Sequence, residues 1–187
     1  MTAPPSLAAF LARHTPALEA MAVWRDGSMR LRVASYLSGE VPPLDDVASV
    51  RTVVLRGLEV LAMRNRDGWH VLPGGRCLAG ETHEETLHRE VLEESGWRIS
   101  RPLPIGFMHL HHLTPKPPGY RYLYPDFLWP VYVSEATSFH PEAKLADDYE
   151  VEAVFRPPAE VRELELAADN RLYLDAALRA RGVAGWR

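Results

Sequence analysis

Three glutamates in the middle of the chain have a spacing that suits a metal site. Glu90, Glu93 and Glu94 occupy positions i, i+3 and i+4, so their carboxylates emerge from one face of a helix. Such like charges repel by about a few tenths of a kcal/mol per pair unless a cation lies among them. Mg²⁺, with Mn²⁺ as a substitute, suits this set because hard oxygen ligands match its octahedral preference. The spacing therefore predicts a magnesium site.

Residues around these glutamates could support such a site. Arg89 can pair along the helix with Glu85 or Glu93 and hold a carboxylate in one rotamer. A strand ends at a double glycine, of which Gly75 is the second residue, and the missing side chains let the backbone come close to a ligand. A glycine carbonyl there could be a further metal ligand. Glu81 lies just before the helix and can reach back across its N-terminus.

The elements that must position these residues are those of an α/β, or α+β, sandwich, in which a mixed β-sheet is flanked by helices. The central helix spans residues 81 to 95, with Thr82 and Glu85 in capping-box spacing and Gly96 ending it. Within a domain of residues 47 to 187, we expect strands at 50–56, 58–63, 69–72, 105–113, 126–133 and 150–155. Loops are expected at 114–119 and 134–148, and a last helix at 158–181.

The first 46 residues form a predicted N-terminal extension. Apolar spacing favours a short helix over residues 6 to 20, broken near Pro16, which could pack on the domain or form a homodimer. Two β-rich runs, 22–24 and 29–37, flank Asp26-Gly27 and predict a hairpin. The proline-rich stretch 39–46 is the expected linker.

Composition limits the class of partner. The 187 residues carry a formal net charge of -4, which argues against stable nucleic-acid binding and against an anionic membrane surface. A nucleotide-sized ligand stays open, because a bound cation can supply positive charge. The single cysteine, Cys77, excludes an internal disulfide framework, and no apolar run approaches a membrane span. A cytoplasmic protein is the expectation.

The residues from Gly75 to Trp97 resemble the Nudix hydrolase signature, which is Gly, five residues, Glu, seven residues, then Arg-Glu-aliphatic-any-Glu-Glu-any-Gly-aliphatic. Here it reads Gly75, RCLAG, Glu81, THEETLH and REVLEESG, followed by Trp97. Every fixed position is present, and the bulky Trp97 in place of an aliphatic residue is the departure. A solvated acidic helix face, the usual interpretation of a charge run, is disfavoured by this match.

The resemblance implies a Nudix-like fold and hydrolysis of a diphosphate linkage in a nucleoside diphosphate derivative. It also implies that Glu90, Glu93 and Glu94 bind the metal with help from the Gly75 carbonyl, while Arg89 and Glu81 orient the carboxylates and the attacking water. The proton acceptor comes from the helix in many members and from a later loop in others. Glu94 is favoured as the acceptor. Its rivals are Glu81, Glu135, Glu142, Asp147, Asp148 and Glu150. A Nudix-fold module that senses nucleotides or binds a partner without turnover is the alternative function.

The segment from His109 to Trp129 is where substrate contacts are expected. Its aromatic residues lie beside Arg121 and could stack on a base and clamp a phosphate, although strand packing explains them equally well. Three nearby histidines, at 109, 111 and 112, favour structural or substrate-contact roles over a transition-metal site. The predicted substrate contacts are Arg121, Tyr122, Tyr124 and His111.

Overall fold

The computed structural model describes residues 6–24, 27–145 and 150–182. The strands within these ranges form one mixed β-sheet. The strand order is β1-β2-β7-β8-β3-β4-β5, with β6 paired to β8 and β9 paired to β4. The bounds are β1 Leu18–Trp24, β2 Met29–Leu37, β3 Arg51–Arg56, β4 Glu59–Asn65, β5 Gly68–His70, β6 Trp97–Ile99, β7 Leu103–His112, β8 Asp126–Phe139 and β9 Glu150–Arg156. The β3–β8 pair is parallel.

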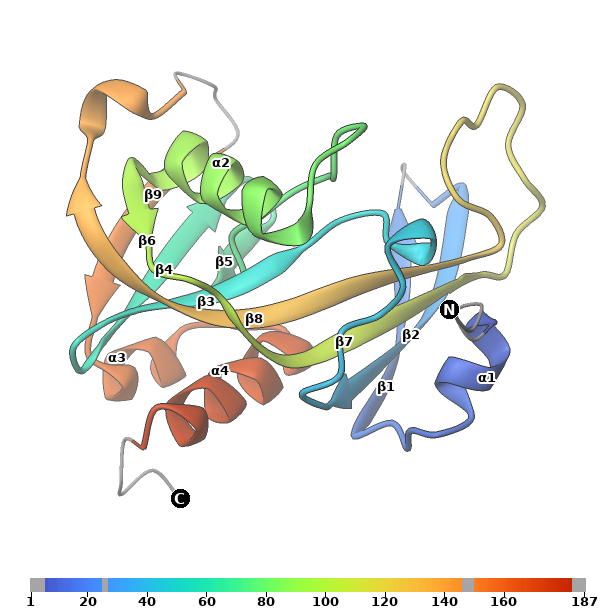
Figure 1. Ribbon diagram of the computed structural model, residues 1–187, viewed down its shortest axis with the longest axis horizontal. Helices are drawn as coiled ribbons and strands as arrows, with labels where there is room; N and C mark the ends of the chain where they lie inside the picture. Colours follow the sequence, from blue (N-terminus) through green and yellow to red (C-terminus); the bar gives the residue numbers. More distant parts are fainter. Residues whose placement is uncertain (1–5, 25–26, 146–149, 183–187) are drawn as a thin grey trace.

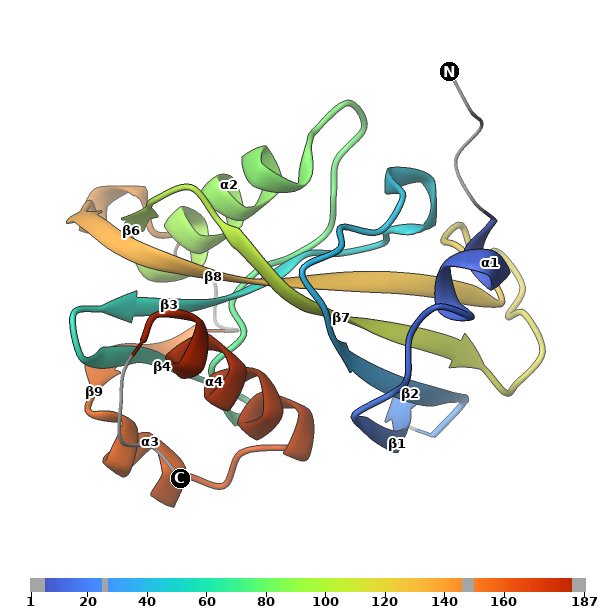
Figure 2. The ribbon, with the colours of Figure 1, turned by 60° about the horizontal axis from the view of Figure 1, so that its bottom comes forward.

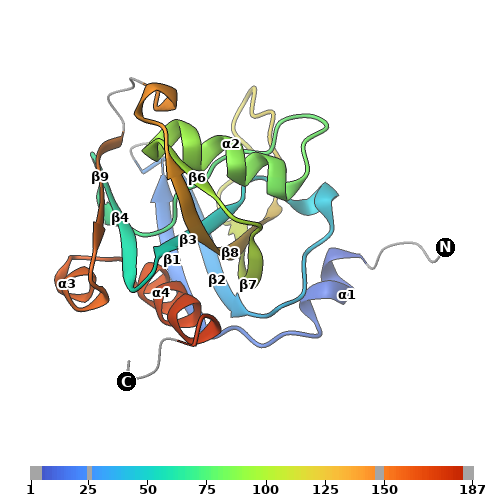
Figure 3. The ribbon, with the colours of Figure 1, turned by 60° about the vertical axis from the view of Figure 1, so that its left-hand side comes forward.

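Helices cover both faces of this sheet, as Figures 1 and 2 show. Helices α1 (Leu7–Leu11) and α2 (His83–Ser95) bury Phe10, Leu87 and Val91 in one hydrophobic core. Helices α3 (Pro158–Glu163) and α4 (Ala168–Ala180) bury apolar side chains in a second core on the opposite face. Figure 3 shows α2 and α4 separated by the sheet. The predicted sandwich of a mixed sheet flanked by helices is confirmed.

The N-terminal segment differs from expectation in one respect. The predicted helix over residues 6 to 20 ends at Leu11, because residues from Leu18 onward pair along β2 and belong to β1 instead. The hairpin itself is confirmed, with Trp24 opposite Met29; Asp26 of its expected turn lies outside the described residues. Strand β2 also pairs with β7, so the hairpin belongs to the same sheet as the signature-bearing region. The boundary after residue 46 stays a prediction.

Two later predictions are wrong. Strand β8 continues to Phe139, where a loop was expected from residue 134, because its second half pairs with the unforeseen strand β6. The predicted helix 158–181 is two helices, since Leu164 adopts an extended conformation with ψ 149°. The Arg171 guanidinium donates hydrogen bonds to the carbonyls of Arg162, Leu164 and Leu166. These bonds satisfy the carbonyls that the break exposes.

The sheet opens between β3 and β4, and this opening positions the site. The two strands pair only next to their turn, at Leu55 with Val60 and at Arg56 with Glu59. Farther from the turn, the edge of β3 receives the segment before α2 instead. Thr52 N–H donates to the Pro73 carbonyl at 3.0 Å, and Val50 N–H donates to the Gly75 carbonyl at 2.9 Å. The double glycine is thereby held beside the start of β3.

Candidate active site

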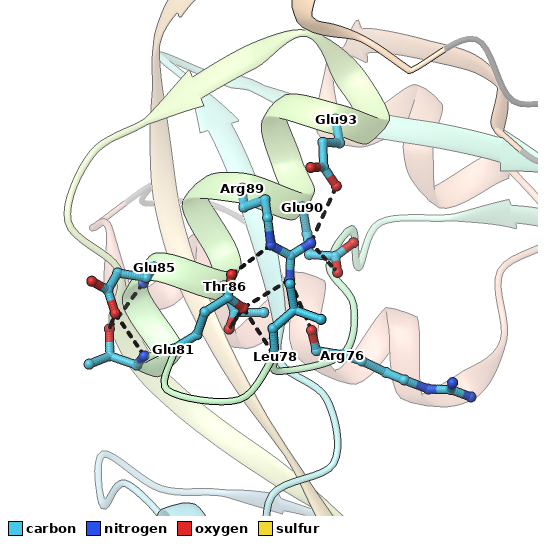
Figure 4. A network of polar contacts seen from close by, with 9 residues as sticks. Arg76, Leu78, Glu81, Glu85, Thr86, Arg89, Glu90 and Glu93 are labelled. Carbon is cyan, nitrogen blue, oxygen red and sulfur yellow. Dashed lines mark hydrogen bonds and ion pairs between the residues drawn. The ribbon is translucent and has the colours of Figure 1, made fainter.

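Local sequence fixes the ends and the rotation of α2. Thr82 and Glu85 form the expected capping box, and Gly96, with φ 77°, ends the helix in the left-handed conformation. Leu87 and Val91 are fully buried. Because these two residues anchor one side of the helix to the core, the side that bears Glu90 and Glu93 faces the loop after the double glycine (Figure 4).

Arg89, on helix α2, is the centre of a charged network that joins the helix to this loop (Figure 4). Its guanidinium donates hydrogen bonds to both carboxylate oxygens of Glu81, at 2.8 and 2.9 Å, and to the Arg76 carbonyl at 3.0 Å. One nitrogen, Nη1, reaches Glu90 at 2.8 Å and Glu93 at 3.3 Å. The expected pairing of Arg89 with Glu93 is therefore present, whereas Glu85 binds the backbone and hydroxyl of its capping partner.

Glu81 supports this arrangement from outside the helix. Hydrogen bonds from Arg89, then from the Leu78 amide and the Thr86 hydroxyl, lower the pKa of Glu81 to about 2. Such a strongly ionised carboxylate is a poor proton acceptor near neutral pH. Its geometry suits an anchor for Arg89, which in turn positions the helix carboxylates.

Gly75 matters through its missing side chain. A Cβ atom built there would lie 2.2 Å from the carboxyl carbon of Glu90, so any larger residue would displace that carboxylate. The Gly75 carbonyl accepts hydrogen bonds from Val50 N–H at 2.9 Å and from the Ser49 hydroxyl at 2.7 Å. These two donors occupy the lone pairs that a metal would use, and the expected ligand role of this carbonyl stays a prediction.

Glu94 occupies a more enclosed position than the other two glutamates. Burial raises the pKa of Glu94 to about 8, despite a hydrogen bond from Gly74 N–H at 2.9 Å and the nearby Arg51 charge. Its carboxylate lines a cavity of about 180 Å³ in the opening between β3 and β4. Glu150, a buried residue at the start of β9, lines the same cavity and lies 3.2 Å from His70 Nε2.

The structure thus brings one of the distant candidate bases, Glu150, to the glutamate helix. Glu135 lies elsewhere, 3.5 Å from Arg181, and Glu142 is an exposed residue beside His140. Asp147 and Asp148 lie outside the described residues. Glu94 and Glu150 therefore share a cavity, while Glu135 and Glu142 have partners away from it.

A larger cavity of about 610 Å³ adjoins the smaller one, and both are lined by Arg51 and Trp129. Arg121 and Tyr122, two of the predicted substrate contacts, line the larger cavity. The guanidinium of Arg76 lies 3.9 Å from the Tyr122 ring centroid. Among the lining residues that sequence reasoning missed are those that β1, β2 and β3 supply. They are Trp24, Met29 and Arg51.

The other two predicted substrate contacts are not among the residues that line this cavity. The Tyr124 hydroxyl donates to the Thr114 carbonyl at 3.1 Å. His111 Nδ1 lies 2.7 Å from Asp126 Oδ1, the same oxygen that His109 Nε2 contacts at 2.7 Å. Asp126 is an acidic partner for these histidines that sequence reasoning did not foresee. Substrate contact by Tyr124 and His111 stays a prediction.

A family model described as the NUDIX domain matches residues 45–177, which is most of the chain. The chain belongs to the NUDIX family. Its activity class is therefore that of a hydrolase acting on phosphoric anhydrides, and the resemblance seen at Gly75–Trp97 is confirmed. No curated protein sequence matches the chain.

Solved structures support the NUDIX fold. The Bacillus subtilis pyrophosphohydrolase has 19% identity and a TM-score of 0.55, with 89% of this chain and 98% of that chain covered. A NUDIX hydrolase from Nitrosomonas europaea has 18% identity and a TM-score of 0.56, with 74% and 95% covered. The NUDIX domain of Shewanella oneidensis NrtR, solved with ADP ribose, has 18% identity and a TM-score of 0.55, with 73% and 88% covered.

The NUDIX residues fit a hard divalent cation by their chemistry. Across the described ranges, no three His, Cys, Asp or Glu side chains already converge as a metal-binding group. Glu90 and Glu93 nevertheless share one cationic centre, Arg89 Nη1, and the Glu90 carboxylate is packed against Gly75. Oxygen donors of this kind suit Mg²⁺. Among the same residues, no helix has the length and apolar character needed to cross a membrane.

Proposed function

We propose that this protein uses Mg²⁺ to hydrolyse a diphosphate linkage in a nucleoside diphosphate derivative. The observation that carries this proposal is the junction of the two cavities. The smaller is lined by Glu94 and Glu150, whereas the larger is lined by aromatic and arginine side chains, and Arg51 lies on both. A diphosphate at the junction would have its organic group in one cavity and its reacting phosphorus near the carboxylates.

In this proposal Glu90, Glu93 and Glu94 hold the cation. When bound, Mg²⁺ neutralises charge on phosphate oxygens and lowers the pKa of a coordinated water. Arg89 is held by its hydrogen bonds to Glu81, and it keeps the neighbouring carboxylates oriented. The water oxygen forms a bond to one phosphorus, the bridging P–O bond breaks, and two phosphate monoesters leave.

Glu94 is the proposed acceptor of the water proton. Its carboxylate accepts a hydrogen bond from Gly74 N–H at 2.9 Å and lines the cavity at the junction. Glu150 is the second candidate, because it shares the cavity and is held by His70. Both are favoured over Glu81, whose pKa is held low by Arg89.

Product release from a panel of nucleoside diphosphate derivatives tests the proposal. We expect turnover with Mg²⁺, weaker or comparable turnover with Mn²⁺, and none in EDTA. Glu94→Gln should lower kcat by about 10² or more, as loss of a general base does. Glu142→Gln, an exposed carboxylate outside both cavities, is the matched control and should retain full activity. Nucleotide binding without metal-dependent turnover would support the non-catalytic module instead.

A cytoplasmic location, a homodimer and a domain boundary after residue 46 also remain proposals. Sedimentation of the purified chain tests the homodimer, and a fragment that begins at residue 47 tests the boundary by its solubility and cooperative unfolding.

A further inference from the structure

The β1–β2 hairpin lies before residues 45–177, which the NUDIX model matches, yet it forms one wall of the larger cavity. Trp24 is the last residue of β1, and its ring stacks on that of Trp129 in β8, with centroids 5.7 Å apart and planes 15° from parallel. Figure 1 shows this hairpin next to β7, whose following loop supplies Tyr120 and Tyr122 to the same cavity. The cavity is therefore closed by a segment that precedes the matched domain.

The lining of this cavity is aromatic and cationic. Among the described residues, three arginines and no aspartate or glutamate line it. The Arg51 guanidinium lies 4.8 Å from the Trp129 ring centroid, and Arg76 donates to the Tyr122 hydroxyl at 2.5 Å. Aromatic faces favour a flat π-system, and guanidinium groups favour an anion. This combination suits a ligand with an aromatic base and phosphate groups.

We propose that the substrate's nucleobase stacks against the wall formed by Trp24 and Trp129, and that Trp24 determines specificity for base-bearing diphosphates. This inference rests on the proposed function, which places the reacting phosphorus near the carboxylates of the smaller cavity. Trp24 lines only the larger cavity, whereas Arg51 and Trp129 line both cavities. Specificity would then reside in the hairpin, outside the signature.

Binding of AMP in EDTA, measured by titration calorimetry, tests this assignment without requiring turnover. Stacking of one base on an aromatic side chain contributes about 1–3 kcal/mol, so Trp24→Ala should weaken AMP binding about tenfold or more. Trp24→Phe, which keeps a ring, should weaken binding less than about threefold. Binding of ribose 5-phosphate, which lacks a base, should be the same in all variants.

Val23→Ala is the matched control. Val23 is the neighbouring residue on β1 with its side chain 61% exposed, and it does not line the cavity. If Trp24→Ala does not fold, Trp24→Leu retains apolar bulk without a ring and should show the same loss. The assignment is overturned if AMP fails to bind the parent, or if AMP binds Trp24→Ala or Trp24→Leu as tightly as the parent.

Kinetics separate this inference from the proposed function. With an active substrate, Trp24→Ala should raise KM for nucleoside diphosphate derivatives and leave kcat within about twofold, because stacking is uniform binding. A parent that binds AMP through Trp24 but hydrolyses nothing would refute the hydrolytic proposal and retain the binding site. A parent that hydrolyses diphosphates with no effect of Trp24→Ala on KM would refute the base-binding role of Trp24 and retain the hydrolytic proposal.

Discussion

Replacing Glu94 by Gln should stabilise the metal-free protein above neutral pH. Burial raises the pKa of Glu94 from 4.5 to about 8, so the folded protein resists ionisation of this carboxyl. The unfolded chain releases the proton near pH 4.5. The stability that the neutral Glu94 carboxyl contributes is therefore fully present below pH 4.5, and this contribution is lost as pH rises towards 8. Glutamine keeps an oxygen for the Gly74 amide and removes this loss.

The size of the effect follows from the pKa. One pKa unit is about 1.4 kcal/mol, so a fully desolvated carboxyl would lose roughly 4–5 kcal/mol between these limits. Glu94 is only partly buried, so solvent reduces this loss, and we expect about 2 kcal/mol. For a chain of this length, that corresponds to a difference in Tm of about 4–8 °C.

Thermal unfolding in EDTA at pH 5 and pH 8 measures the difference. Glu94→Gln should exceed the parent in Tm at pH 8 and match it closely at pH 5. The control is Glu93→Gln, because Glu93 is more exposed and already pairs with Arg89; it should show no stabilisation at pH 8. Equal Tm values for parent and Glu94→Gln at pH 8 would refute the account of a buried, neutral carboxyl.

Three further substitutions test the supporting contacts. Arg89→Lys should lower kcat about 10- to 100-fold with little change in Tm, since lysine lacks the fork that grips both Glu81 oxygens; unchanged kcat would contradict that role. Gly75→Ala should lower activity at least tenfold by displacing Glu90, while Gly39→Ala, which meets open space, should not; equal activity of both would contradict the close contact. Arg171→Met should lower the free energy of unfolding, measured in urea, by about 1–2 kcal/mol. The exposed Arg179→Met is the control and should lose less; an equal loss in both variants would attribute the effect to the removed charge.

The glutamate helix could be predicted from the sequence because its determinants are local. The capping box of Thr82 and Glu85, the terminal Gly96 and the buried pair Leu87 and Val91 all lie within α2 or at its ends. They set the helix ends and its rotation, and the rotation sets the direction of the carboxylates. The spacing of the signature likewise identified the family, since it joins the glycine loop to this helix.

Element ends and distant partners depended on tertiary structure. Residues 158 to 181 have helical periodicity throughout, yet Arg171 stabilises a break at Leu164 that local propensity does not reveal. Strand β8 extends beyond the end of its apolar sequence because β6 pairs with it there. In both cases a contact between separate segments overrides a local preference.

The site beyond the helix was decided in the same way. His70 and Glu150 are 80 residues apart in sequence, and they meet because β9 pairs with β4 in the part of the sheet that diverges from β3. Trp24 reaches Trp129 because β1, β2, β7 and β8 lie in that order across the sheet. Strand order and the opening between β3 and β4 are long-range properties, so they determine which carboxylate and which aromatic residues join the locally encoded glutamates.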